Sequence, residues 1–194
     1  TFAGQQETYL NVCGEEALLL AMRNCWASLW TERATLYRSK QNVDQRAVKL
    51  AIVVQRMVMA EVAGVLFTAN PITGERDLAI IDANPGLGEA VVAGMVTPDH
   101  FVVHKPTGQI RQRVLGAREV EVRPRTDGGV EAIQRDQDST QLSLSAPQLD
   151  TLTQLGNRIE QHYGAPQDIE WAWAAGQFYI LQARPITALP TPVN

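Results

Sequence analysis

The stretch DIEWAWAAGQFYILQARP, residues 168–185, predicts a β-hairpin in which polar residues interrupt an apolar pattern at two-residue intervals. Side chains of a β-strand point alternately to the two faces of a sheet. Asp168 and Glu170 therefore share one face of the first strand, and Ile169 and Trp171 share the other. The hairpin predicts a sheet with one apolar face and one face that carries charge.

The length of the turn decides how the second strand meets these acids. A two-residue turn at Ala175–Gly176 splits the polar groups between the two faces. A three-residue loop at 174–176, with glycine in the left-handed conformation, sets Asp168 opposite Gln182. We predict the three-residue loop, because a slip of one residue would ruin both faces. It also places five apolar side chains on one buried face, namely Ile169, Trp171, Trp173, Tyr179 and Leu181.

In this register the polar face gathers two carboxylates, the amide of Gln182 and the guanidinium of Arg184. Carboxylate and amide oxygens are hard ligands of the kind that Mg²⁺ prefers, alongside waters and substrate phosphates. The neighbouring arginine offers a fork for phosphate oxygens. A solvated sheet face with a cross-strand pair between Asp168 and Arg184 explains the alternation equally well, so the pattern alone leaves both interpretations open.

Composition excludes several classes of protein. The 194 residues are 45% hydrophobic and 20% charged, as in an ordinary globular protein, and the net charge is −4. A chain without a basic surplus does not hold nucleic acid by counterion release. No apolar run approaches the roughly 20 residues of a membrane span. Cys13 and Cys25 lack metal-ligand spacing and favour a reducing, cytoplasmic setting. The chain opens at Thr1 without a methionine, which is expected of a fragment.

The rest of the chain predicts an α+β fold, mainly an antiparallel sheet flanked by helices. Residues 15–38 are expected to form one helix whose Leu, Met and Trp stripe packs in the core. Residues 145–148 resemble a capping box that starts a second helix, which ends at Gly164. A glycine-rich turn at 85–88 leads into a short helix. The predicted strands are 48–58, 64–69 (after a turn at 60–64), 77–83, 100–105 and stretches of 110–124, with an edge strand in an exposed loop at 126–143.

Five motifs occur in an order that resembles one family. The resemblance is to the ATP-grasp nucleotide-binding domain of the phosphoenolpyruvate synthase and pyruvate phosphate dikinase family, which includes rifampin phosphotransferase. It implies a partial ATP-grasp domain over 1–188, mostly the C-terminal lobe, and the start of a linker at 189–194. The motifs are AGQQET (3–8), VVQRMV (53–58), GVLFTANPITG (64–74), PGLGEAVVAG (85–94) and DIEW…QARP.

The resemblance assigns two segments to the nucleotide. The loop with Gly4 and Thr8 is implied to lie over the ATP phosphates, where glycine lets the backbone approach and the threonine hydroxyl donates. Gln55, Met57 and Val58 fall in the segment that is implied to read the adenine. Without the family, the first segment is an ordinary turn before a helix and the second is a core strand.

The hairpin residues acquire roles in the same way. Glu170 and Gln182 match the residues that hold the magnesium–triphosphate, and both are implied metal ligands. Asp168 and Arg184 match their supporting neighbours, and Arg184 joins the two ligands in the implied catalytic set. Glu89 falls at an acid sometimes placed near the nucleotide. A plain turn at the start of a helix explains the glycines beside it equally well.

By resemblance, the parent enzyme moves the β-phosphoryl of ATP to a carrier histidine and then to pyruvate, giving phosphoenolpyruvate, AMP and phosphate. The carrier histidine belongs to a separate swivelling domain, and the acceptor domain is also separate. His100, His104 and His162 do not sit in the carrier motif and are expected to be surface or strand histidines. The fragment is therefore expected to be inactive alone. The alternatives are an antibiotic kinase of the rifampin phosphotransferase type and a non-catalytic nucleotide-binding module.

Overall fold

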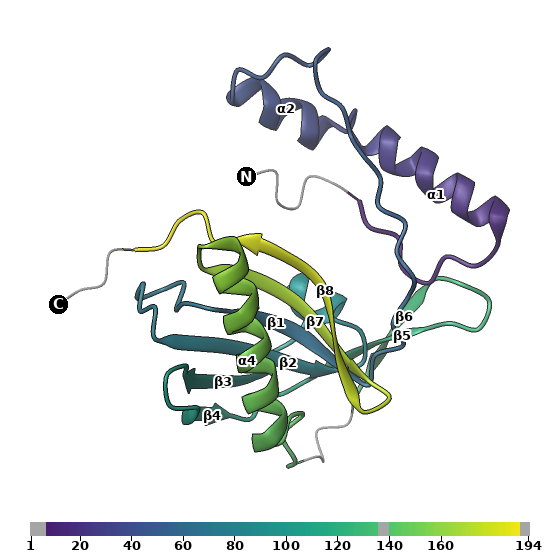
Figure 1. Cartoon of the computed structure of the whole chain (residues 1–194). Helices are drawn as coiled ribbons and strands as arrows, with labels where there is room; N and C mark the ends of the chain where they lie inside the picture. The colour runs from purple at the N-terminus through teal and green to yellow at the C-terminus, as the bar shows by residue number, and fades with distance from the viewer. Residues whose placement is uncertain (1–6, 136–139, 191–194) are drawn as a thin grey trace. The chain divides into compact units, whose positions relative to one another are not determined.

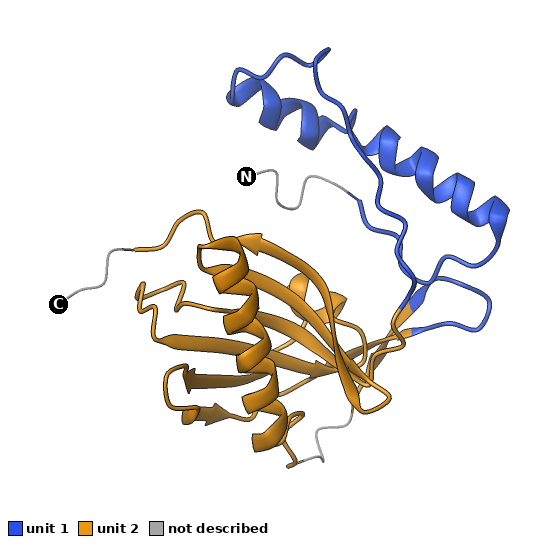
Figure 2. Ribbon diagram, viewed as in Figure 1, with its two compact units in different colours: residues 1–57, 124–130 blue, residues 58–123, 131–194 orange. Residues whose placement is uncertain are grey.

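The computed structural model describes residues 7–135 and 140–190 (Figure 1). They form two compact units, which are described separately (Figure 2). Unit 1 comprises Thr1–Met57 with Pro124–Val130, and unit 2 comprises Val58–Arg123 with Glu131–Asn194. The predicted phosphate-loop residue Gly4 and the last four residues of the predicted linker lie outside the described residues.

Unit 1 contains two helices, α1 (Glu15–Ser28) and α2 (Glu32–Lys40), where the sequence predicted one helix over 15–38. That prediction was wrong because Thr31 caps a new helix: its side chain accepts a hydrogen bond from the Ala34 N–H at 3.3 Å. The buried guanidinium of Arg38 donates to the carbonyl of Leu29 at 2.5 Å. It thereby satisfies an acceptor that the helix break exposes.

The apolar stripe of these helices is not core, which corrects a second prediction. None of its members is buried, and the side chains of Trp26 and Trp30 remain 49% and 61% exposed. Trp26 donates to the carbonyl of Leu50 at 3.2 Å. Residues 48–60 belong to no strand, although a strand was predicted at 48–58. Helical spacing identified an apolar surface, but not whether this chain buries it.

Unit 2 is built on a six-stranded antiparallel sheet, which confirms the predicted α+β class. The strand order across the sheet is β4-β3-β2-β1-β7-β8. A second, two-stranded sheet consists of β5 and β6. The strands are β1 (Val62–Phe67), β2 (Leu78–Pro85), β3 (Asp99–His104), β4 (Gln109–Val114), β5 (Val120–Pro124), β6 (Val130–Gln134), β7 (Gln167–Ala174) and β8 (Gln177–Pro185).

Gly64 lies inside β1, although the sequence suggested a turn at 60–64. A Cβ atom built at this position would lie 1.9 Å from the backbone carbonyl oxygen of Asp82 in β2. The glycine therefore permits a close approach between two central strands instead of reversing the chain.

Helix α4 (Ala146–Tyr163) covers one face of the sheet (Figure 1). It begins with the predicted capping box between Ser145 and Gln148, and it ends at Gly164 in the left-handed conformation, φ 69°. Its buried Leu149 and Leu152 join a core of sheet residues. We call this side of the sheet the core face, and its largest fully buried members are Trp171, Phe101, Leu66, Ile81 and Ile169.

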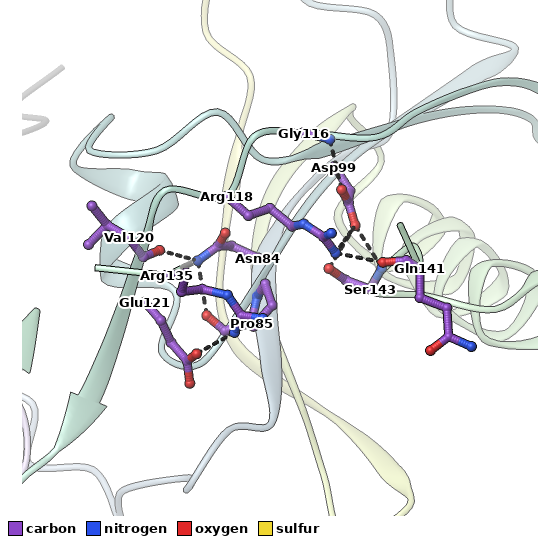
Figure 3. Close-up of polar contacts among 10 residues, drawn as sticks. All are labelled: Asn84, Pro85, Asp99, Gly116, Arg118, Val120, Glu121, Arg135, Gln141 and Ser143. Atoms are coloured by element: carbon purple, nitrogen blue, oxygen red, sulfur yellow. Dashed lines mark hydrogen bonds and ion pairs between the residues drawn. The ribbon is translucent and has the colours of Figure 1, made fainter. Parts of the chain in front are cut away.

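A buried carboxylate ties the connecting segments to β3 (Figure 3). Asp99 accepts hydrogen bonds from the Gly116 N–H at 2.8 Å and from the Ser143 N–H at 2.6 Å. Arg118 adds an ion pair at 3.5 Å. Because the carboxylate is fully buried, these donors replace the water that it has lost.

Candidate active site

The β7–β8 hairpin turns at Ala175–Gly176, so the predicted three-residue loop was wrong. Ala174 pairs with Gln177, and the two turn residues have φ values of 49° and 76°. Positive φ at both positions is the feature of a type I′ turn, which matches the twist of the flanking strands. The Glu61 carboxylate supports the turn by accepting the Ala175 N–H at 2.9 Å.

A β-bulge then restores the arrangement that a two-residue turn alone would destroy. Trp171 pairs with Ile180 while Glu170 pairs with Gln182, so Leu181 is an extra residue in β8. The strand shifts by one residue at this point. Gln182 consequently lies on the same face as Glu170.

The pairing within the hairpin differs from the prediction on both faces. Asp168 lies opposite Arg184, where Gln182 was predicted. Near the turn, Tyr179 lies opposite Ala172 and thus on the polar face, whereas Phe178 packs against the core. The four polar side chains of the hairpin nevertheless share one face, as the sequence predicts. The bulge, which the sequence analysis did not consider, is the reason.

Asp168 and Arg184 form an ion pair across the two strands. The Arg184 Nε and an Nη atom donate to Asp168 Oδ2 at 2.8 and 2.7 Å. The Arg184 side chain is 48% exposed, so this pair adds little stability by itself. It is the pair that the solvated-face interpretation expects, and it accounts for two of the four polar groups.

Glu170 and Gln182 are left without such partners. Among the described residues, neither side chain takes part in a hydrogen bond or an ion pair. Burial raises the pKa of the half-buried Glu170 carboxyl, and the charge of Asp168 raises it further, while Arg184 opposes both effects. A carboxylate and an amide that face each other unpaired form a donor set suited to a hard cation.

The hairpin forms one edge of a larger polar surface. Val65 of β1 lies opposite both Glu170 and Asp82, and Asp82 lies opposite His100 of β3. We call this side of the sheet the open face, meaning the face opposite α4 that carries Val65, Asp82, His100, Asp168, Glu170, Gln182 and Arg184. The His100 Nδ1 lies 2.7 Å from Asp82 Oδ1.

Sequence reasoning missed Asp82 and the pairing of His100. A signal was available, because each residue alternates with apolar neighbours in a predicted strand, as Glu170 does. The sequence did not say which strands are neighbours, so nothing indicated that the two residues meet.

The remaining predicted residues lie outside the hairpin. Thr8, Gln55 and Met57 belong to unit 1, where the first two are exposed and Met57 is half-buried. In unit 2, Val58 is half-buried and Glu89 is exposed at the start of α3 (Glu89–Val92).

The glycines before α3 serve packing. Gly86 has a φ of 82°, and a Cβ there would lie 2.6 Å from the Val122 carbonyl oxygen. Gly88 lies against Ala63, on the same side of the sheet as Glu170. This supports the plain helix-start turn that the sequence left open.

The described residues contain a cavity apart from the open face but no cluster of three metal-ligating side chains. Within residues 7–135 and 140–190, no group of three or more His, Cys, Asp or Glu side chains gathers to hold a metal ion. A cavity of about 420 Å³ lies at the C-terminal end of α4, but it contains none of the predicted residues. Its lining includes Lys105, which is paired with Glu160 at 2.6 Å.

In the same described ranges, no helix is long and apolar enough to cross a membrane.

The sheet thus has one packed face and one face on which an acid and an amide, unpaired among the described residues, lie beside an arginine. The chain belongs to the family of the pyruvate phosphate dikinase AMP/ATP-binding domain, whose sequence profile matches residues 1–193.

Relatives of two kinds are equally similar to the chain. Phosphoenolpyruvate synthase of Pyrococcus furiosus is 47% identical over 97% of this chain and 24% of its own length. Rifampicin phosphotransferase of Streptomyces sviceus is 47% identical over 99% of the chain and 22% of its own length. A probable phosphoenolpyruvate synthase of Methanocaldococcus jannaschii is 44% identical over 97% and 16%. The chain thus spans a quarter or less of the length of these relatives.

Proposed function

We propose that the open face binds ATP together with Mg²⁺, and that it serves the ATP half-reaction of a phosphoenolpyruvate-synthase-type phosphotransferase. The observation that carries the proposal is that Glu170 and Gln182 face each other across the hairpin. Glu170 is half-buried, and neither side chain forms a hydrogen bond or an ion pair with a described residue. An unpaired ionised carboxylate at such a position is costly unless a ligand uses it.

The donor set fits magnesium. Mg²⁺ is usually bound by one or two carboxylates, with waters and substrate phosphates completing its coordination, so it does not need a cage of three acids. Glu170 and Gln182 would hold the ion, and the bound ion would neutralise part of the negative charge of the phosphates. Asp168 orients Arg184, whose guanidinium is then positioned for phosphate oxygens.

The other nucleotide contacts follow the family resemblance. We propose that Gly4 and Thr8 contact the phosphates and that Glu89 lies near the nucleotide. The adenine is proposed to contact Gln55, Met57 and Val58. These residues and the hairpin are proposed to belong to one partial ATP-grasp domain over 1–188. The free thiols of Cys13 and Cys25 support a cytoplasmic setting for the protein.

The whole-protein reaction is proposed from the relatives. The β-phosphoryl of ATP passes to a carrier histidine on a swivelling domain and from there to pyruvate, with water consumed and phosphoenolpyruvate, AMP and phosphate formed. The chain's part in this sequence is positioning and charge stabilisation of the polyphosphate by Glu170, Gln182 and Arg184. Carrier and acceptor domains are expected elsewhere in the parent protein.

A second candidate is a phosphotransferase acting on a rifamycin-type antibiotic. The equal identity to relatives named for both activities favours neither branch. Incubating the full-length protein with ATP and either pyruvate or rifampicin, and detecting the phosphorylated acceptor, distinguishes the two.

The ATP half-reaction is tested by Glu170→Gln in the full-length protein. The substitution keeps size and hydrogen bonding but removes the charge. We expect conversion of ATP to AMP to fall on the order of 10²–10³-fold, as when one stabilising group of a transition state is lost. Glu131→Gln, an exposed acid of β6, is the matched control and should leave turnover unchanged. Undiminished turnover by Glu170→Gln would exclude the assignment.

Measuring the conversion of ATP to AMP by the unmodified protein also distinguishes the proposed enzyme from a non-catalytic nucleotide-binding module. A module that only binds nucleotide would show no ATP-to-AMP conversion with either acceptor. The proposed enzyme converts ATP to AMP and forms a phosphorylated histidine, which is detected after quenching at alkaline pH.

A further inference from the structure

A histidine–aspartate pair lies on the open face, on the far side of Val65 from the proposed metal ligands. Across the sheet, His100, Asp82, Val65 and Glu170 occupy one row of directly opposed residues. Neighbouring strands lie about 4.8 Å apart, so the His100 and Glu170 backbones are about 14 Å apart. A triphosphate with its metal ion, together with the reach of the two side chains, spans such a distance, so the phosphates of one ligand are able to contact both positions.

The aspartate fixes the imidazole and leaves one nitrogen available. His100 Nδ1 and Asp82 Oδ1 are 2.7 Å apart, and the two side chains are 36% and 24% exposed. A hydrogen bond to one ring nitrogen determines the orientation and protonation of the other. Nε2 has no partner among the described residues, and its ring is accessible from the open face.

The surroundings of His100 favour its charged form. The hydrogen bond that His100 donates to Asp82 raises the pKa of His100, burial opposes this, and the charge of Asp82 adds to the increase. On the other side, β4 presents Val114 opposite His100 and Gln112 one pair further along the same face. Neither of these carries charge, so Asp82 is the charged group that faces the imidazole from the two strands beside it.

A positive charge at His100 would favour the binding of an anionic ligand to the open face. The open face carries the carboxylates of Asp82, Asp168 and Glu170, and Arg184 is already paired with Asp168. A polyphosphate adds further negative charge, and an imidazolium donor would offset it with a charge-assisted hydrogen bond.

We propose that His100 is an oxyanion-binding residue of this face, donating its Nε2–H to an oxygen of the terminal phosphates of ATP while Asp82 holds the ring. The inference rests on the proposed function, since it takes the ligand of the open face to be ATP. It adds a binding residue from a strand that neither the hairpin nor the motifs include.

The test is a calorimetric titration of the full-length protein with a non-hydrolysable ATP analogue and, separately, with AMP. His100→Gln keeps a neutral donor and should weaken binding of the analogue about 10-fold near pH 6.5, with AMP affinity unchanged. His100→Arg, a permanent cation, should restore the affinity and remove its pH dependence. His104→Gln is the matched control on the same strand and face, and it should bind as the unmodified protein does.

The pH dependence has a definite sign. The raised pKa means that His100 is charged below that pKa and loses the charge as pH rises through it. Affinity for the analogue should therefore fall as pH rises, and Asp82→Asn should move the fall to lower pH. Circular dichroism of each variant checks that the fold is intact.

Two results overturn the inference: analogue binding by His100→Gln that equals the unmodified protein across this pH range, or an equal loss for the analogue and AMP. The outcome is separable from that of the proposed function. If Glu170→Gln abolishes turnover while His100→Gln binds normally, only the inference fails. If Glu170→Gln turns over normally while His100→Gln loses phosphate-dependent affinity, only the proposed half-reaction fails.

Discussion

Glu170 and Trp171 are neighbours in β7, yet they belong to the two opposite faces of the sheet. Trp171 is fully buried on the core face and meets the ring of Phe178 edge-on, with centroids 5.6 Å apart. Glu170 is half-buried on the open face, and its carboxylate forms no hydrogen bond or ion pair with a described residue. The apolar surface of one face is covered within the chain, whereas the carboxylate on the other face has no partner among the described residues.

This difference is the basis for assigning stability to one face of the sheet and for proposing ligand binding at the other. The core face is apolar and packs against α4, so its apolar side chains are covered within the chain. The open face concentrates charge in rows, and part of that charge remains unpaired. The unpaired carboxylate is the reason for proposing that a ligand binds to the open face.

The largest effect on this comparison should come from the core face. Trp171→Ala removes a large buried side chain, and we expect the free energy of unfolding to fall by about 3–5 kcal/mol. Urea unfolding of the chain followed by circular dichroism measures the change.

Trp171→Phe is the matched control for that experiment. The indole N–H of Trp171 is buried with no acceptor among the described residues, so phenylalanine removes an unsatisfied donor along with some volume. We expect a loss below about 1.5 kcal/mol. Equal losses for alanine and phenylalanine would mean that the indole N–H, and not the buried apolar volume, provides the stability at this position.

Most of the fold was predictable from local pattern. Alternation identified the strands of the six-stranded sheet from 64 onward, and the capping box with Gly164 located α4. These signals are short-range, because each depends on residues within one element. The predictions failed where the outcome depends on what an element packs against, as for the exposed Trp26 and Trp30.

The site was predictable only in part, for a related reason. Alternation placed Asp168 and Glu170 on one face, and the family motifs supplied their roles. The pairing of Asp82 with His100 depends on which strands are adjacent, which local sequence does not contain. The bulge at Leu181 keeps the polar side chains on one face despite the two-residue turn. No residue type in this stretch marks the position of the bulge, so the sequence does not reveal it.

The bulge gives the second prediction, of intermediate size. Deleting Leu181 makes the β7–β8 ladder regular while keeping Glu170 opposite Gln182 and both faces sorted. We expect a cost of about 1 kcal/mol and ATP-to-AMP turnover in the full-length protein within about 10-fold of the unmodified enzyme.

A neighbouring deletion provides the contrast. Removing Ala183 leaves the bulge in place and moves Arg184 to the core face, where an arginine has no partner. This variant should lose the hairpin's pairing and all turnover, because a one-residue slip exchanges the faces. If both deletions behave alike, the sorting of polar from apolar residues is not what the bulge provides.

The smallest effect should be a gain in the free energy of unfolding, caused by a substitution on the open face. Because the folded-state pKa of Glu170 is raised, mainly by burial, its ionised form lowers the stability of the folded chain at neutral pH. Glu170→Gln should therefore increase the free energy of unfolding at pH 7 by on the order of 0.5 kcal/mol, in the absence of nucleotide. The increase should shrink as pH falls below the unfolded-state pKa, about 4.3, where the native carboxyl is protonated in both states. Urea titrations at pH 7 and near pH 4 measure the difference. A loss of stability at pH 7 would mean that Glu170 is paired inside the chain, and the contrast between the two faces would fail at the residue on which it depends.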